Sequence, residues 1–407
     1  ADSAREATRF GVRATLDGVD LPGVTAYREG VVSRLHKGLQ GLVSSRKVDY
    51  VQGEGRLEGE RTVVVGDRRL VGRHVVLATG SYARTLPGLE LGGPIMTSDG
   101  ALALTEVPKC IVVLGGGVIG VEFASVMRSF GADVTIVEAL PRLVAAEDPA
   151  VSTALERAFK KRGIAFRTGV RFESATPTES GVTVRLEGGD ELSADVLLVA
   201  VGRGPSTAGL GFEDAGVSVE RGFVITDERC RTSVDGVYAV GDIVPGLQLA
   251  HRGFAQAIFV AEDIAGLDPV PLVESSIPRV TYCEPEIASV GLTQAQATEQ
   301  YGDRGETYEY NLGGTGKSQI LRTQGFATLV ERRSRFVKLV RVKDGPVVGI
   351  HMVGSRMGEQ IGEAQLIVSW EAHAEDVAAL LHAHPTQNEA LGEAHLALAG
   401  KPLHAHN

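Results

Sequence analysis

The residues His382, His384 and Glu389 lie close together near the C-terminus, in the stretch HAHPTQNEA. A residue that precedes proline is disfavoured in the helical conformation, so we expect His384 just outside a helix, with Pro385 as its first residue. This helix should run through TQNEALGEAHLALA and end at Gly400. Glu389 would then lie early in the helix, close enough to fold back to His384. A carboxylate bonded to an imidazole fixes its tautomer and raises its basicity, as a general base requires. The stretch therefore predicts a general base, although a helix entry that contains histidine by chance would look the same.

Gly115, Gly117 and Gly120 form a GxGxxG motif that follows an apolar run and opens a predicted helix, and Glu138 follows 18 positions after Gly120. This order is the dinucleotide-binding fingerprint, in which the second glycine lets the backbone approach a pyrophosphate at a helix N-terminus. Glu138 can accept hydrogen bonds from ribose hydroxyls and would repel a 2′-phosphate, so the motif favours NAD over NADP. The alternative is a glycine-rich turn in an α/β domain that binds no nucleotide.

Two weaker features do not indicate a site. The stretch GGTGKS at 313–318 resembles a phosphate-binding loop, but Asn311 stands where that pattern requires glycine, and no apolar strand precedes it. His395, His404 and His406 have no carboxylate or thiol at ligand spacing. We therefore expect no metal and a solvated C-terminal tail.

Composition excludes several classes of protein. The net charge of −10 argues against a nucleic-acid partner held through phosphates. No apolar run approaches the roughly 20 residues that a membrane span needs, and ADSAREATRFGV has no secretory apolar core. Cys110, Cys230 and Cys283 are scattered without CxxC or metal spacing, which indicates a reducing compartment such as the cytoplasm and no disulfide framework.

The elements around these residues are predicted to alternate between strands and helices. Residues 111–114 read as a buried strand within a βαβ unit, a second helix is expected at about 149–162, and His74 to Ala78 reads as another buried strand. Towards the C-terminus, RFVKLVRVKDGPVVGIHMVG reads as a hairpin around Asp344-Gly345. Two helices, at about 357–372 and 374–382, should follow it.

Six motifs occur in the order seen in the FAD-dependent pyridine nucleotide–disulfide oxidoreductases: ATGS, GGGVIGVE, VAVGRGP, VYAVGD, LAH and HAHPTQNE. The chain resembles this family over essentially its whole length. The resemblance implies an α/β fold with two Rossmann-like nucleotide-binding domains and a C-terminal α+β dimerisation domain. Its boundaries would be 1–107 and 231–274 for an incomplete FAD domain, 108–230 for the NAD domain and 275–407 for the interface domain.

The resemblance also implies an activity. The enzyme would oxidise dihydrolipoamide and pass electrons through a redox disulfide and FAD to NAD. His384 would be the acid–base that exchanges a proton with the dithiol, and Glu389 would orient it. A homodimer would deliver His384 to the flavin site of the other subunit. The partner would be the lipoyl domain of a 2-oxo acid dehydrogenase complex, served by this chain as its E3 component.

The remaining site residues follow from the same match. Those implied for NAD are Gly115, Gly116, Gly117, Val118, Ile119, Gly120, Val121, Glu122, Glu138, Val170 and Gly202. Those implied for FAD are Gly55, Thr79, Gly80, Ser81, Asp242, Gln248, Leu249, Ala250 and His251. Asp242 also has independent support, because an acidic residue at the carboxyl end of a strand lies where α/β sheets bind ligands.

The chain departs from the family pattern at one point. The family begins with an FAD-binding glycine motif and a CxxxxC pair that forms the redox disulfide, and neither is present in these 407 residues. We therefore interpret the chain as an N-terminally truncated member. The resemblance pairs Glu122 with a lysine of the missing helix.

Three alternatives stay open. A reductase of the glutathione type shares fold and base but usually takes NADP, which Glu138 opposes while the nearby Arg142 keeps the question open. A mercury reductase would usually need a C-terminal cysteine pair, whereas this chain ends KPLHAHN. A non-catalytic remnant is the third possibility.

Overall fold

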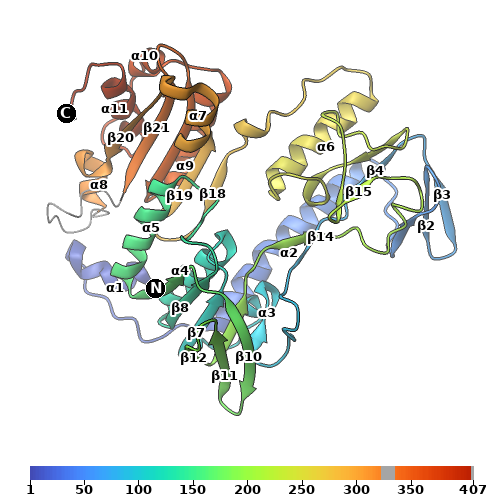
Figure 1. The fold of residues 1–407 in the computed structure, drawn as a ribbon, viewed down its shortest axis with the longest axis horizontal. Coiled ribbons are helices and arrows are strands. Elements are labelled where there is room, and N and C mark those ends of the chain that lie inside the picture. Colours follow the sequence, from blue (N-terminus) through green and yellow to red (C-terminus); the bar gives the residue numbers. More distant parts are fainter. Residues whose placement is uncertain (322–334, 405–407) are drawn as a thin grey trace. The chain divides into compact units, whose positions relative to one another are not determined.

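The computed structural model describes residues 1–321 and 335–404. The chain divides into two compact units (Figure 1). Unit 1 comprises Ala1–Val19, Thr85–Val201 and Ser275–Asn407, and unit 2 comprises Asp20–Arg84 and Gly202–Glu274. Unit 1 holds both the nucleotide-binding sheet and the C-terminal sheet, so the three predicted domain boundaries remain a prediction.

The first sheet of unit 1 is parallel and carries the glycine motif. The strands Val196–Val199 and Cys110–Leu114 are buried over almost their whole length, because continuous apolar runs suit a sheet covered on both faces. Their order is β6 (Ile95–Met96), β13 (Val196–Val199), β7 (Cys110–Leu114), β8 (Asp133–Glu138) and β9 (Ile164–Thr168). Helices α4 (Val118–Phe130) and α5 (Pro149–Arg162) connect β7, β8 and β9 in sequence. The predicted strand at 111–114 and helix at 149–162 are confirmed.

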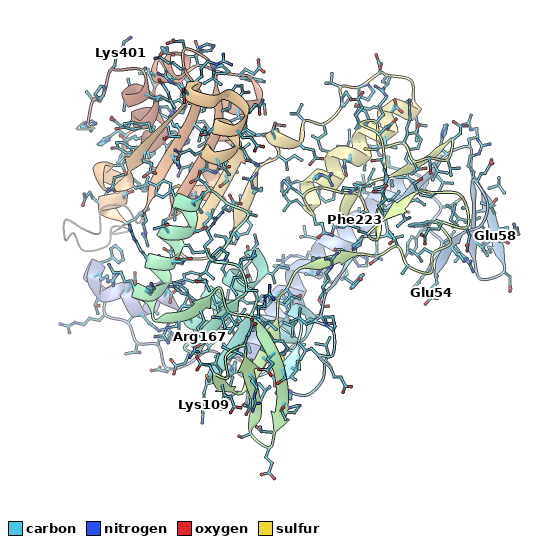
Figure 2. The ribbon with its side chains drawn as sticks, viewed as in Figure 1. Glu54, Glu58, Lys109, Arg167, Phe223 and Lys401 are labelled. Carbon is cyan, nitrogen blue, oxygen red and sulfur yellow. The ribbon has the colours of Figure 1, made fainter. Side chains whose placement is uncertain are left out.

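Smaller elements surround this sheet. An antiparallel meander of β10 (Phe172–Thr178), β11 (Gly181–Leu186) and β12 (Glu191–Ala194) follows β9. Short helices α1 (Asp2–Glu6), η1 (Ala7–Phe10) and α3 (Ser98–Leu102) belong to the same unit. Arg167 of β9, labelled in Figure 2, forms an ion pair with Asp190 in the turn between β11 and β12.

The second sheet of unit 1 is antiparallel. Its strand order is β18 (Arg279–Thr281), β19 (Glu286–Gly291), β22 (Val347–Gly354), β21 (Phe336–Val342) and β20 (Gly305–Asn311). The predicted hairpin around Asp344-Gly345 is therefore confirmed, as β21 and β22. The 3-10 helix η3 (Glu274–Ser276) precedes β18, η4 (Gly302–Arg304) precedes β20 and η5 (Leu312–Gly314) follows it. The helices of this part are α7 (Gln294–Tyr301), α8 (Gly316–Ile320), α9 (Met357–Ser369), α10 (Ala374–Ala378) and α11 (Glu389–Leu398).

Three helix boundaries differ from the prediction. Helix α9 ends at Ser369, three residues before the predicted end. Helix α10 ends at Ala378, four residues early. The N–H of Leu380 donates to the carbonyl of Val377, three residues back, and this bond closes the last turn in place of the α-helical bond to the fourth residue back. Helix α11 begins at Glu389, so the prediction that Pro385 starts it was wrong. Side-chain bonds at Thr386 close a turn before the helix instead: its hydroxyl donates to Ala383 and its N–H donates to Glu389.

Unit 2 contains a long helix, α2 (Leu21–Ser45), and several short sheets. Its parallel pair is β4 (Val75–Leu77) with β17 (Val237–Ala239), so the strand predicted at 74–78 is confirmed. One antiparallel sheet has three strands, β1 (Gly55–Leu57), β2 (Thr62–Val65) and β3 (Arg68–Val71). Two antiparallel pairs are β5 (Ser81–Ala83) with β14 (Arg203–Pro205) and β15 (Val219–Glu220) with β16 (Phe223–Val224). The remaining helices are η2 (Gly241–Ile243) and α6 (Ala250–Ile264). Among the described residues, no helix is both long and apolar enough to cross a bilayer.

Candidate active site

His384 and Glu389 lie together, as the sequence predicted. Nδ1 of His384 is 2.8 Å from Oε1 of Glu389, and the other carboxylate oxygen accepts the N–H of Thr386 at 2.7 Å. The His384 side chain is 75% exposed, whereas the Glu389 side chain is 20% exposed. Nε2 of His384 has no partner among the residues that the structure describes. The imidazole is thus held at one nitrogen and free to exchange a proton at the other.

A second carboxylate, Glu363 of α9, organises the same turn, and sequence reasoning missed it. Its Oε1 lies 2.7 Å from Nε2 of His382, and its Oε2 accepts from Nδ2 of Asn388, the N-cap of α11, at 2.7 Å. Burial opposes ionisation of Glu363, but the bonds from His382 and Asn388 outweigh it and lower the pKa of this carboxyl. The hydrogen bond to Glu363 raises the pKa of His382. Glu363 therefore fixes the turn on both sides of His384.

The stretch GGTGKS contacts the histidine motif instead of forming a phosphate-binding loop. Ser318 donates to Oε1 of Gln387 at 2.7 Å, and Gln387 donates to the carbonyl of Ser355 at 3.0 Å. A Cβ placed on Gly316 would lie 3.6 Å from Cε1 of His384. This stretch is therefore a support of the turn.

The prediction of a solvated C-terminal tail was wrong for His395, whereas the His404 side chain is 64% exposed, as predicted. His395 is fully buried within α11, where its Nδ1 donates to the carbonyl of Leu391 at 2.7 Å. His404 lies 2.7 Å from a carboxylate oxygen of Glu393, and this carboxylate also accepts its N–H. The carboxylate is on the adjacent helix, so sequence spacing did not reveal it. His406 lies outside the described residues.

The glycine motif forms the turn between β7 and α4. Gly115 has φ of 109°, and a Cβ there would meet the carbonyl oxygen of Ala200 at 2.3 Å. A Cβ on Gly120 would lie 1.9 Å from the carbonyl oxygen of Gly115. A Cβ on Gly117, the N-cap of α4, would have no atom of the described residues within 4 Å, and no side chain among them caps the helix. The first turn, Val118 to Val121, therefore presents an open N-terminus that fits a pyrophosphate.

Glu138, at the end of β8, closes the loop from the other side. Its Oε2 accepts the N–H of Gly116 at 2.6 Å, and its Oε1 accepts the N–H of Leu140 at 2.7 Å. The carbonyl of Glu138 accepts the N–H of Val170 at 3.1 Å, so both predicted residues lie at this edge. Arg142 donates to the carbonyls of Ala145 and Glu147, and this engagement of its guanidinium weakens the NADP alternative.

Glu122 of α4 takes a different partner from the one that the resemblance implied. Its Oε1 accepts the backbone N–H of Tyr282 at 2.7 Å. Burial raises the pKa of Glu122 despite this bond. In this structure Glu122 thus ties α4 to the connection between β18 and β19 of the second sheet.

The predicted flavin residues of unit 2 gather at the carboxyl ends of β4 and β17. Ser81 donates to Oδ2 of Asp242 at 2.5 Å and accepts from Nε of Arg203 at 2.7 Å. Thr79 donates to the carbonyl of Ser206, and Gly80 has φ of 73°. Gln248 donates to the carbonyl of Asp242 at 3.2 Å. Arg203 was not predicted, although it belongs to the quoted VAVGRGP motif.

The start of α6 completes this group. Leu249 is its N-cap without a side-chain cap, and Ala250 and His251 are its first residues. An uncapped helix N-terminus beside a carboxylate fits the polar part of a flavin, with Asp242 accepting from hydroxyls. Gly55 lies in β1 and Gly202 follows β13 with φ of 111°. Their part in binding stays a prediction, as do the individual cofactor contacts.

The three cysteines are unpaired. Burial raises the pKa of Cys230 to about 11 and that of Cys283 above its usual range. Burial also raises the pKa of Cys110. These thiols stay protonated at neutral pH and are poor nucleophiles.

A parallel sheet with an open glycine loop, together with an exposed carboxylate-bound histidine, defines a dinucleotide-binding enzyme with an acid–base group. Residues 3–257 match the family model described as pyridine nucleotide-disulphide oxidoreductase, and residues 277–395 match the dimerisation domain of that family. The chain belongs to the pyridine nucleotide-disulphide oxidoreductases. It is an NAD-dependent flavoprotein enzyme of α/β fold, with FAD and NAD as cofactors, and its dimerisation domain supports the predicted homodimer.

Curated relatives and a solved structure agree with this assignment. The dihydrolipoyl dehydrogenase of Bacillus subtilis is 35% identical over 99% of this chain and 87% of the relative. The dihydrolipoyl dehydrogenase of Chlorobaculum tepidum is 40% identical over 97% of this chain and 84% of the relative. The crystal structure of LpdA from Mycobacterium tuberculosis superposes with a TM-score of 0.88 at 24% identity, covering 98% of this chain and 86% of that one, and shows the shared fold.

Proposed function

We propose that the chain provides the NAD site and the acid–base of a dihydrolipoyl dehydrogenase. The observation that carries the proposal is the exposed imidazole of His384, held at Nδ1 by Glu389. The reaction removes two electrons and two protons from a dithiol. Two electrons and one proton leave as hydride to NAD, and His384 passes the other proton to the medium. The relatives with this name, at 35% and 40% identity, support the substrate class.

Each part of the chain has one task in this reaction. FAD, when bound, relays the electron pair between dithiol chemistry and hydride transfer. Asp242 and the start of α6 would hold the flavin, and the loop Gly115–Gly120 with Glu138 would hold NAD. His384 takes a thiol proton, because the thiolate is the nucleophile in disulfide exchange.

The partner and the location are the finer parts of the proposal. As an E3 component, the enzyme would meet its substrate on the lipoyl domain of a 2-oxo acid dehydrogenase complex. The unpaired cysteines suit a reducing compartment, and we place the enzyme in the cytoplasm.

The test compares two proteins in one assay of NAD reduction by dihydrolipoamide. The first is the chain 1–407. The second, called the extended enzyme below, is this chain preceded by a segment that carries a glycine motif and a CxxxxC pair. We expect the chain 1–407 to be inactive, because its three scattered thiols provide no redox disulfide. An active, yellow extended enzyme supports the proposal, and an extended enzyme that binds flavin but leaves dihydrolipoamide unoxidised contradicts it.

A further inference from the structure

The segment 142–148 connects the glycine loop to the dimerisation domain. At its beginning, the N–H of Val144 donates to the carbonyl oxygen of Gly116 at 2.8 Å. A Cβ on Gly116 would lie 2.6 Å from Cδ2 of Leu143, so the Leu143 side chain rests on the glycine. Val144 has φ of 42°, which a β-branched residue adopts only where its surroundings impose it. The segment is therefore held firmly against the loop.

At its end, the segment is bound by a cation of the dimerisation domain. Asp148 is fully buried and caps α5 by accepting the N–H of Ala150 at 3.0 Å. The same carboxylate accepts from Nζ of Lys338 at 2.9 Å and from the N–H of Gln294 at 3.0 Å. Lys338 is 3% exposed, on β21 between β22 and the edge strand β20, and also donates to Oε1 of Gln294 at 2.8 Å. The ammonium has a fixed position as a result.

The neighbouring residue repeats this arrangement. Glu147 is 6% exposed and accepts from Nε of Arg279 at 3.1 Å. Arg279 lies on β18, an edge strand of the same sheet. The segment is thus anchored twice to the dimerisation domain.

Buried ion pairs give little net stability, because desolvation of the charges offsets their attraction, but they do fix geometry. The geometry fixed here reaches the nucleotide loop through one peptide plane. In a trans peptide the C=O and the following N–H point in opposite directions, so the bond that holds the carbonyl of Gly116 also sets the direction of the Gly117 N–H. That N–H belongs to the N-cap of α4, where the surroundings are open.

We propose that Lys338 is a positioning residue for NAD, acting through Asp148 and the segment 142–148 on the Gly116–Gly117 peptide. The inference rests on the proposed NAD site at Gly115–Gly120. It assigns to the dimerisation domain a part in nucleotide affinity as well as in assembly. Arg279 acts in the same way through Glu147.

The test measures NADH affinity from the fluorescence of bound NADH in the extended enzyme and, separately, the thermal midpoint of unfolding. Lys338→Met alone leaves Asp148 buried without its cation and should lower the midpoint. The double variant Asp148→Asn with Lys338→Met removes both charges, so its midpoint should return close to wild type. Its NADH dissociation constant should still be about tenfold higher, because the anchor at Asp148 is missing and the pair of Arg279 with Glu147 holds only the neighbouring residue. Arg341→Met is the matched control: Arg341 lies on the same strand but pairs with Glu306, away from the segment.

The outcomes separate this inference from the proposed function. Weak NADH binding by the double variant, with a normal midpoint and a normal Arg341→Met control, supports the inference. A double variant that binds NADH within twofold of wild type overturns it and leaves the NAD site intact. A wild-type protein that fails to bind NADH overturns both.

Discussion

Nδ1 of His384 and Oε1 of Glu389 are 2.8 Å apart, across a turn that the same carboxylate closes at Thr386. One side chain therefore orients the imidazole and builds the turn that presents it. A carboxylate in this position stabilises the imidazolium that forms when the base takes a proton.

Glu389→Gln in the extended enzyme should slow dihydrolipoamide oxidation by about 10- to 100-fold, because the neutral amide stabilises the imidazolium less. Steady-state rates with saturating NAD measure the effect. Glu393→Gln is the matched control. Glu393 lies on the same helix as Glu389, and its carboxylate bonds His404 in a similar way. Equal losses in both variants would mean that Glu389 has only a structural role.

Glu138→Arg should move nucleotide preference towards NADP. The substitution replaces repulsion of a 2′-phosphate with a charge-assisted bond worth about 1.5–3 kcal/mol, or about 10- to 100-fold in the affinity ratio. Absolute affinities should fall as well, since Glu138 also accepts the N–H of Gly116. Titration with NADH and NADPH gives the ratio; an unchanged ratio would place the ribose elsewhere.

Two alanine substitutions in the glycine loop should affect different properties: Gly120→Ala should lower stability, and Gly117→Ala should lower NADH affinity. Gly120→Ala brings a Cβ to 1.9 Å from the carbonyl oxygen of Gly115, and overpacking of this kind costs about 1–3 kcal/mol of unfolding free energy. Gly117→Ala meets no described atom within 4 Å and has φ of −75°, so its stability should be normal. Its NADH affinity should nevertheless fall, because the new methyl group occupies the approach of the pyrophosphate. Normal affinity in Gly117→Ala would exclude this loop as the binding site.

Acid should destabilise the protein through His395. Burial lowers the pKa of this histidine from 6.5 to about 4, so below pH 6.5 the unfolded chain binds a proton that the folded chain refuses. Stability falls with pH through this window by about 1.4 kcal/mol per unit at most. His395→Asn keeps a donor for Leu391 and removes the titration, so its stability should fall less between pH 6.5 and 5. Denaturant unfolding at both pH values tests this, and parallel losses in the two proteins would refute it.

The pair of His382 with Glu363 changes stability with pH in the opposite direction to His395. The pKa of His382 is raised by Glu363, so its contribution is complete below pH 6.5 and disappears as the pH rises through the raised value. Because His395→Asn leaves this pair in place, the comparison with wild type isolates the buried histidine.

The sequence predicted the parts of the fold that local patterns control. The apolar run 111–114 and its glycine turn gave β7 and the start of α4, and Asp344-Gly345 gave the hairpin. The pairing of His384 with Glu389 was also predictable, because both residues lie on one turn. The start of α11 was not, because side-chain bonds at Thr386 close a turn that propensities alone would have made helical.

The supporting residues were hidden by distance along the chain. Asp148 and Lys338 are 190 positions apart, and Glu363 and His382 are 19 apart on separate elements. No local pattern links such residues. A lysine in an alternating strand has the same sequence pattern whether its side chain is buried or exposed. The packing of the two parts of unit 1 brings Asp148 to Lys338, and the position of α9 beside the turn after α10 brings Glu363 to His382.

The central claim is that His384 serves the dithiol half of the reaction alone. Stopped-flow absorbance of the flavin in the extended enzyme measures the two halves separately, with dihydrolipoamide or NADH as reductant. For His384→Gln we predict that reduction by dihydrolipoamide slows by about 100-fold or more, whereas reduction by NADH stays within about twofold of wild type. Unchanged reduction by dihydrolipoamide, or an equal loss with both reductants, would contradict the account.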